Sequence, residues 1–272
     1  MLARFRFSFL LFLVALLSPL VGCSDAFDPF VESDQTFALY GFLDARAGTQ
    51  FVRLQLITAR AEGGSTDDAR VTSTDLTTGA TLAWRDSLAL PGEGASGTVF
   101  VADFQPVAGR AYRIEAVRRT GGAATTAEVR LPSEPALRPD DPDVFNEVVS
   151  QVLRIETAEV PGAIAVTYTV RAEGAEPRRF DVAYDTAEPV DAGFGVLLSL
   201  SRDAGTVLSS FEPGAEVELL ALEIAYDVVD GRAAPVTGGL GLVGAAARFT
   251  SRWTLAPGIV EALGFVDAQG AK

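Results

Sequence analysis

The chain has 272 residues, with 22 lysine and arginine residues, 36 aspartate and glutamate residues, no histidine and one cysteine. Without histidine it can form no Ser-His-Asp triad and no histidine-ligated zinc or haem site, and one cysteine can form neither an internal disulfide nor a Cys-rich metal cage. Lysine occurs only at Lys272, which argues against a catalytic lysine, and the net charge of −14 argues against nucleic-acid binding. We therefore expect no nucleic-acid partner and no cofactor.

The N-terminus resembles an export signal. Arg4 and Arg6 precede an uncharged segment, 7–22, which is too short to span a bilayer, since a helical span needs about 20 apolar residues. The segment runs into Leu-Val-Gly-Cys, which resembles the lipobox of bacterial lipoproteins, where the cysteine thiol receives diacylglycerol and the chain is cleaved before it. The resemblance implies a lipoprotein signal peptide over 1–22 and lipidation of Cys23. The alternative is an ordinary signal peptide with an unrelated cysteine.

Residues 23–35 are predicted to form an acidic tether, because they carry four carboxylates and no basic residue. An acidic chain is repelled by anionic headgroups, whereas several acyl chains give stable anchoring at about 0.8 kcal/mol per buried methylene. We therefore expect attachment to the cell envelope through lipid. By analogy with lipoprotein sorting, Ser24 after the cysteine favours the outer membrane, and the membrane face stays open.

Residues 36–131 alternate between apolar and polar side chains, which is typical of antiparallel strands. About seven strands in about 100 residues predict an immunoglobulin-like or transthyretin-like sandwich. The predicted strands cover 36–43, 50–56, 68–74, 80–86, 97–103, 110–119 and 125–131.

Residues 132–143 are predicted to form a linker rich in proline and aspartate. Asp143 can cap a short helix that begins at Val144. A second β-rich domain is expected over 144–272, as another sandwich or an open barrel, with a helix from Pro257 near its end. The sequence thus predicts an all-β protein. The predicted strands of the second domain are 163–171, 180–184, 194–202, 206–211, 216–229 and 247–255.

The order of the first domain resembles one bacterial family. Strand-like segments at 37–44, 51–56, 69–79 and 108–117 precede, much later in the chain, the glycine-rich segment Gly-Gly-Leu-Gly-Leu-Val-Gly at 238–244. These features resemble Bacteroidetes-type outer-membrane lipoproteins with an uncharacterised transthyretin-like or immunoglobulin-like domain, often encoded near TonB-dependent receptors. The resemblance implies a location and a receptor context, and it implies no activity.

Two motifs match known ligand sites only in part. Residues 239–244 fit the dinucleotide pattern G-x-G-x-x-G, but 248–255 alternates like a strand where that motif needs a helix, so a turn or bulge between strands is favoured. Asp140, Asp141 and Asp143 offer oxygen atoms to calcium without the spacing of an EF-hand, which favours a solvated linker and a helix cap. We expect neither a nucleotide nor a metal ion.

Trp84 and Trp253, the only tryptophans, each lie on a predicted strand. They could stack on a sugar ring or anchor an interface, although a core position is the more common outcome. We predict a non-enzymatic, lipid-anchored envelope protein that presents β-domains to a protein or glycan, as an accessory to an outer-membrane transporter if the family context applies. The alternatives are a carbohydrate-binding surface lipoprotein that uses exposed aromatics and, more remotely, a hydrolase that uses paired carboxylates.

Overall fold

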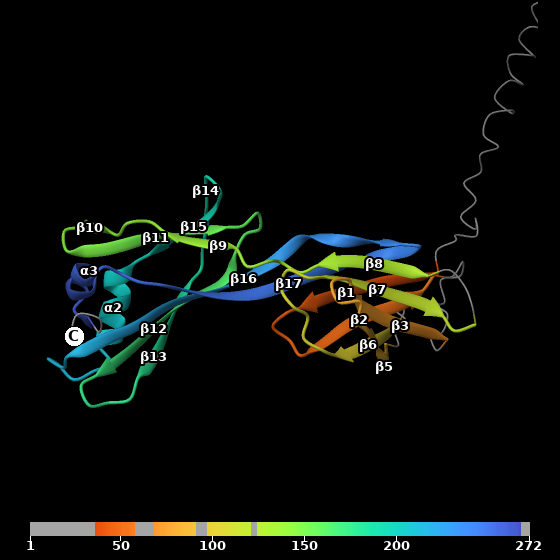
Figure 1. Ribbon diagram of the computed structural model, residues 1–272, viewed down its shortest axis with the longest axis horizontal. Coiled ribbons are helices and arrows are strands. Elements are labelled where there is room, and N and C mark those ends of the chain that lie inside the picture. Colours follow the sequence, from red (N-terminus) through yellow and green to blue (C-terminus); the bar gives the residue numbers. More distant parts are fainter. Residues whose placement is uncertain (1–35, 58–67, 91–96, 121–123, 268–272) are drawn as a thin grey trace, which may run out of the picture.

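The computed structural model describes residues 36–57, 68–90, 97–120 and 124–267 (Figure 1). Strands dominate this part of the chain, and two short helices interrupt them near the C-terminal end. The strands enclose two separate hydrophobic cores, one for each domain. The prediction of an all-β protein is confirmed.

The N-terminal domain is a sandwich, as predicted. One layer has the strand order β4–β3–β7–β8 and the other has the order β5–β6–β2–β1. Alternate side chains such as Val52, Leu54 and Ile114 point into the core between the layers. The predicted strand 80–86 is divided at Trp84 into two shorter strands. The strands are β1 (Phe37–Asp44), β2 (Thr49–Leu56), β3 (Ala69–Asp75), β4 (Thr81–Ala83), β5 (Arg85–Leu90), β6 (Gly97–Asp103), β7 (Ala111–Arg118) and β8 (Thr125–Arg130).

The C-terminal domain also has two sheets, and two helices pack against its core. In one sheet β12 lies between β13 and β16, and in the other β11 lies between β10 and β15, with β9 also paired to β11. Its elements are β9 (Ala136–Pro139), β10 (Asp143–Phe145), β11 (Val148–Glu156), β12 (Gly162–Ala172), β13 (Arg178–Tyr184), β14 (Glu188–Val190), β15 (Gly193–Leu198), α2 (Leu200–Leu208), β16 (Val217–Thr237), β17 (Gly239–Trp253), α3 (Pro257–Ala262) and β18 (Val266–Asp267).

The predicted helix from Val144 is wrong, and the segment predicted as a linker contains β9 and the first residue of β10. Asn146 and Glu147 have φ values of 48° and 67°, which makes them the two central residues of a tight hairpin turn. The turn pairs Phe145 with Val148, residues that favour a strand. Turn chemistry therefore outweighed the helix-capping signal of Asp143.

The predicted strand 206–211 is also wrong, because residues 200–208 form helix α2. Leu200, Ala204 and Val207 are buried on one side of this helix, at the spacing of successive helical turns. The helical period was therefore present in the sequence, and the predicted strand 194–202 ends earlier for the same reason. The predicted helix from Pro257 is confirmed as α3.

The long hairpin β16–β17 belongs to both domains, as Figure 1 shows. Near Trp253 the two strands pair with each other, and β16 also pairs with β12 in the C-terminal sheet. Beyond Asp230 their pairing is interrupted by a bulge and resumes at Ala234, while the end of β16 also pairs with β8 and β17 runs parallel to β1. Val243 and Ala245 are fully buried in the N-terminal core. The sequence-based boundaries do not include this contribution of β17, since they assign residues 144–272 to the second domain.

The glycines of the 238–244 segment allow β17 to pack closely against β1 of the first domain. Gly238 has a φ of +68° and makes the turn between β16 and β17. At Gly241, where φ is +111°, a Cβ atom would lie 2.0 Å from the carbonyl oxygen of Leu39. The motif lies in a strand pair rather than in a βαβ unit, so these glycines permit close approach of two backbones.

Candidate functional site: an exposed aromatic face

The residues singled out in the sequence do not form an exposed site. Cys23 lies outside the described residues. Trp84 and Trp253 are each only 6% exposed and belong to the N-terminal and C-terminal cores respectively. The indole Nε1 of Trp253 donates to Oε1 of Gln151 at 3.0 Å, whereas the Nε1 of Trp84 has no hydrogen-bond partner among the described residues. Neither ring is available as a stacking platform, which corrects the interpretation of these residues as binding groups.

A different group of side chains forms an apolar surface on the N-terminal domain. We call it the aromatic face: Tyr40, Phe42, Phe51, Leu240 and Leu242. Each side chain is between 40% and 54% exposed, and together they come from β1, β2 and β17. Their combined apolar surface is on the order of 400 Å², a size at which the largest patch on a monomer is often functional.

The strand register makes this surface continuous. Tyr40 on β1 lies opposite Leu242 on β17, and Phe42 lies opposite Phe51 on β2. Gly244 on β17 lies opposite Phe42, and a Cβ atom there would lie 2.7 Å from the phenyl ring. The missing side chain thus makes room for the ring of Phe42 over the backbone of β17.

The sequence of β1 carries a signal for this face. In β1 the residues of both sides are apolar, since Leu39 and Leu43 point into the core while Tyr40 and Phe42 point out. A strand with two apolar sides is typical of a sheet that is covered on both sides. Here the second side of β1 is exposed among the described residues, which makes it a candidate contact surface.

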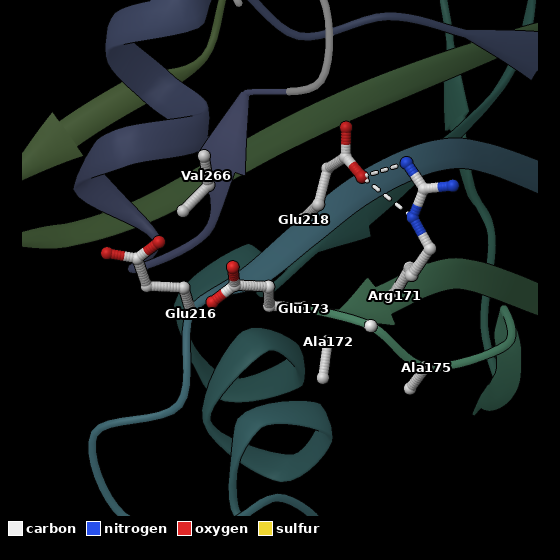
Figure 2. A pocket seen from close by; sticks show the side chains of 8 residues that line it. Arg171, Ala172, Glu173, Ala175, Glu216, Glu218 and Val266 are labelled. Atoms are coloured by element: carbon white, nitrogen blue, oxygen red, sulfur yellow. Dashed lines mark hydrogen bonds and ion pairs between the residues drawn. The ribbon is translucent and has the colours of Figure 1, made fainter.

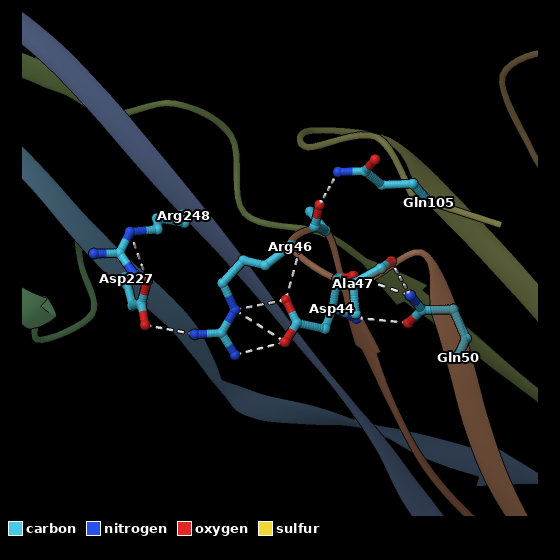
Figure 3. A network of polar contacts seen from close by, with 8 residues as sticks. Asp44, Arg46, Ala47, Gln50, Gln105, Asp227 and Arg248 are labelled. Carbon is cyan, nitrogen blue, oxygen red and sulfur yellow. Dashed lines mark hydrogen bonds and ion pairs between the residues drawn. The ribbon is translucent and has the colours of Figure 1, made fainter. Parts of the chain in front are cut away.

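An ionic network fixes the end of β1 against the hairpin, as Figure 3 shows. The Arg46 guanidinium donates to both carboxylate oxygens of Asp44, with Nε at 2.7 and 2.9 Å, and also reaches Asp227 on β16. The hydrogen bonds from Arg46 hold the pKa of Asp44 below its usual value against the opposing effect of burial. The buried amide of Gln50 completes the turn by donating to the carbonyl of Ala47 at 2.7 Å. The strands that carry the aromatic face are therefore held at a fixed position relative to the C-terminal domain.

The C-terminal domain contains a buried carboxylate with several partners. Oδ2 of Asp203 accepts hydrogen bonds from the hydroxyls of Tyr168, at 3.1 Å, and Tyr184, while Oδ1 accepts from Arg202 at 3.0 Å. Burial is the main cause that raises the pKa of both tyrosines, and the nearby carboxylate adds to it. Because its oxygens are already bonded, this cluster fastens α2 to β12 and β13.

A shallow pocket of about 420 Å³ lies at the far end of the C-terminal domain (Figure 2). Arg171 pairs with Glu218 there, and Glu173 and Glu216 line the pocket close by. Among the described residues no group of three or more potential metal ligands occurs. Asp140 of the predicted acidic cluster instead binds Arg154, with distances of 2.7 Å to Nε and 2.8 Å to Nη2. The aromatic face is the stronger candidate site.

Within the described ranges, neither helix is long and apolar enough to cross a bilayer. No family model matches the chain, and no curated protein matches it. A solved structure of the N-terminal four Ig domains of Dscam1 isoform 6.9 is similar with a TM-score of 0.20 and 12% identity, over 82% of this chain and 60% of that chain. This likeness is too small to support an argument about function.

Proposed function

We propose that this protein is a lipid-anchored, non-enzymatic binding protein of the bacterial cell envelope, and that its aromatic face contacts a protein partner. The observation that carries the proposal is the face itself: five large apolar side chains, adjacent in register, stay partly exposed on one side of a sheet. Water contact with such a surface is unfavourable by roughly 25 cal/mol per Å², so covering it favours association.

The place where the tether joins the domain supports a partner at the membrane. Residues 24–35 precede Thr36, whose backbone N–H donates to the carbonyl of Gly238 at 3.4 Å, next to the start of β1. At no more than about 3.6 Å per residue, the tether allows a distance of at most about 50 Å between Cys23 and the start of β1. An anchor on Cys23 would keep the aromatic face within reach of a membrane protein, for which an outer-membrane receptor is the family-based candidate.

The composition of the face favours a protein over a glycan. Leu240 and Leu242 provide two of its five side chains, and branched aliphatic groups pack against apolar protein surface rather than hydrogen-bond to sugars. One partner contributes about 800 Å² to a standard interface, so the aromatic face has the size of an interface core with a polar rim around it.

The test is a crosslinked pull-down from the native envelope. The wild-type protein should recover one membrane protein, and Phe51→Ser or Leu242→Ser should lose it. Phe145→Ser is the matched control, because Phe145 is 71% exposed on the other domain. Cys23→Ala should reduce recovery by removing the anchor.

Equal recovery by the wild-type protein and both face variants would overturn the proposed binding site. Unchanged membrane attachment of Cys23→Ala would overturn the proposed anchor. If the pull-down finds no partner and a glycan array shows binding that Phe51→Ser abolishes, the carbohydrate-binding alternative replaces the protein partner.

A further inference from the structure

A separate pocket opens at the edge of the N-terminal sandwich, and we call it the Arg110 pocket. It has a volume of about 430 Å³ and lies between the end of β3, strand β4 and the connection from β6 to β7. Leu82, Phe104, Val107 and Tyr112 contribute its apolar lining, and Arg110 is the cationic residue that lines it. A concave apolar site with a few polar groups is the usual form of a small-ligand site.

The apolar lining is held in place by contacts behind it. The ring of Phe104 lies 6.0 Å from the ring of buried Trp84, at an angle of 76°, and 6.0 Å from the ring of Tyr112. The Tyr112 hydroxyl accepts a hydrogen bond from the backbone N–H of Val107 at 2.9 Å. These contacts fix the rings before any ligand arrives, which lowers the entropic cost of binding.

The polar end of the pocket is an ion pair in which one partner has spare hydrogen-bonding capacity. Oδ2 of Asp75 accepts from Nη1 of Arg110 at 2.8 Å, and Oδ1 accepts from the backbone N–H of Thr77 at 2.8 Å and of Thr78 at 3.3 Å. Burial opposes the ionisation of Asp75, but these bonds outweigh it and hold its pKa below the usual value.

Both oxygens of Asp75 are therefore engaged, whereas Arg110 is not saturated. Its guanidinium carries five N–H groups, and Asp75 is its one ion-pair partner in the part of the chain that the structure describes. The side chain is 38% exposed, so the remaining donors can meet an incoming acceptor. A planar guanidinium fits a carboxylate with two parallel hydrogen bonds.

We propose that the Arg110 pocket binds a monocarboxylate that carries an aromatic or branched aliphatic group. The carboxylate bonds to Arg110, and the apolar group lies against Leu82, Phe104 and Val107. A single negative charge fits better than two, because the carboxylate of Asp75 repels a second. Such a group occurs in a free small acid and at the C-terminus of a peptide that ends in an apolar residue.

The test is a titration of the full chain with 3-phenylpropionate, followed by NMR chemical shifts. We expect saturable shifts at residues of the pocket, with weaker binding of 3-phenylpropanol, which lacks the charge, and of acetate, which lacks the ring. A hexapeptide that ends in phenylalanine, compared with its C-terminal amide, then distinguishes a peptide terminus from a free acid.

Two pairs of variants test the site. Arg110→Gln should weaken binding of 3-phenylpropionate about tenfold or more, equivalent to about 1.4 kcal/mol. Arg113→Gln is its control, because Arg113 lies three residues further on, in β7, in an exposed pair with Glu128. Val107→Asp should abolish binding, whereas Val160→Asp changes an exposed valine outside the pocket and should leave binding unchanged.

Failure of 3-phenylpropionate to saturate the protein would overturn the proposal, as would equal binding of the acid and the alcohol. Equal effects of Arg110→Gln and Arg113→Gln would overturn the role of Arg110. Thermal unfolding of each variant confirms that it is folded. None of these outcomes bears on the aromatic face, which uses other residues on β1, β2 and β17.

Discussion

Gly241 provides the most direct test of the long hairpin that completes the N-terminal sandwich. The change Gly241→Ala adds one methyl group on β17, at a residue whose φ is +111°. That methyl carbon would lie 2.0 Å from the carbonyl oxygen and 2.8 Å from the carbonyl carbon of Leu39 on β1. Both are backbone atoms of the paired strand, so they can move only if the pairing of β1 with β17 is disturbed.

The expected loss combines two effects. A side chain at this positive φ costs about 1–3 kcal/mol in backbone strain. Separation of β1 from β17 would also loosen the packing of Val243 and Ala245, which are fully buried. We expect a total loss of roughly 3–5 kcal/mol in the free energy of unfolding, a large share of the roughly 5–15 kcal/mol typical of a folded protein.

The measurement is urea unfolding followed by tryptophan fluorescence. Trp84 reports on the N-terminal core and Trp253 on the C-terminal core, so single-tryptophan variants separate the two signals. Gly205→Ala is the matched control, because Gly205 lies inside helix α2 and a Cβ atom there meets nothing within 4 Å. This control should raise stability by about 0.5–1 kcal/mol.

A loss of less than about 1 kcal/mol in Gly241→Ala would refute the argument, because the contact with Leu39 would then relax without disturbing the sheet. The same conclusion would follow if the Trp84 signal were unchanged, since the change lies in the N-terminal core.

Three further predictions follow from the cores. Trp253→Phe should lower the free energy of unfolding by about 1–2 kcal/mol more than Trp84→Phe does. The first change breaks a buried hydrogen bond to Gln151, whereas the second removes an N–H that has no partner among the described residues. Urea unfolding measures both losses, and equal losses would contradict this account. The pKa of Tyr184 is raised in the folded protein, so its neutral hydroxyl stabilises the fold fully below about pH 10, the unfolded pKa, and this stabilisation is lost as the pH rises towards the folded pKa. Tyr184→Phe should therefore have a lower free energy of unfolding than the wild type at pH 7 and a shallower decline of that free energy above pH 10. Parallel pH profiles of the two proteins would exclude the effect. A truncated chain, residues 36–135, should stay unfolded by circular dichroism because it lacks the hairpin tip, whereas a native spectrum would show that the sandwich needs no completion.

The local structure was largely predictable, because alternation is a property of short segments. It predicted the strands that became β2, β7 and β12 to within about two residues at each end, which is the usual spread of boundary assignments. The failures came where local signals competed, as at Asn146 and Glu147, where turn geometry outweighed an N-cap signal from Asp143.

The parallel pairing of β1 with β17 was not predictable from such patterns, since about 200 residues separate the two strands. The aromatic face was not predictable for the same reason. Exposure of Tyr40 and Phe42 depends on which strand lies beside β1 and on what covers its outer side, and neither is written in the alternation of β1 itself. Trp84 and Trp253 were candidate binding residues because they are large aromatic residues, but tryptophan is also often mostly buried.

The aromatic face consequently depends on the hairpin for its assembly. Leu240 and Leu242 join Tyr40 only when β17 lies along β1, so the face exists only in the completed sandwich. A change such as Gly241→Ala, which adds no exposed side chain to the face, should therefore weaken recovery of the partner in proportion to the loss of the β1–β17 pairing. Phe51→Ser should instead weaken recovery with little change in unfolding, because the ring is 54% exposed. The contrast between these two variants separates the integrity of the fold from the chemistry of the contact.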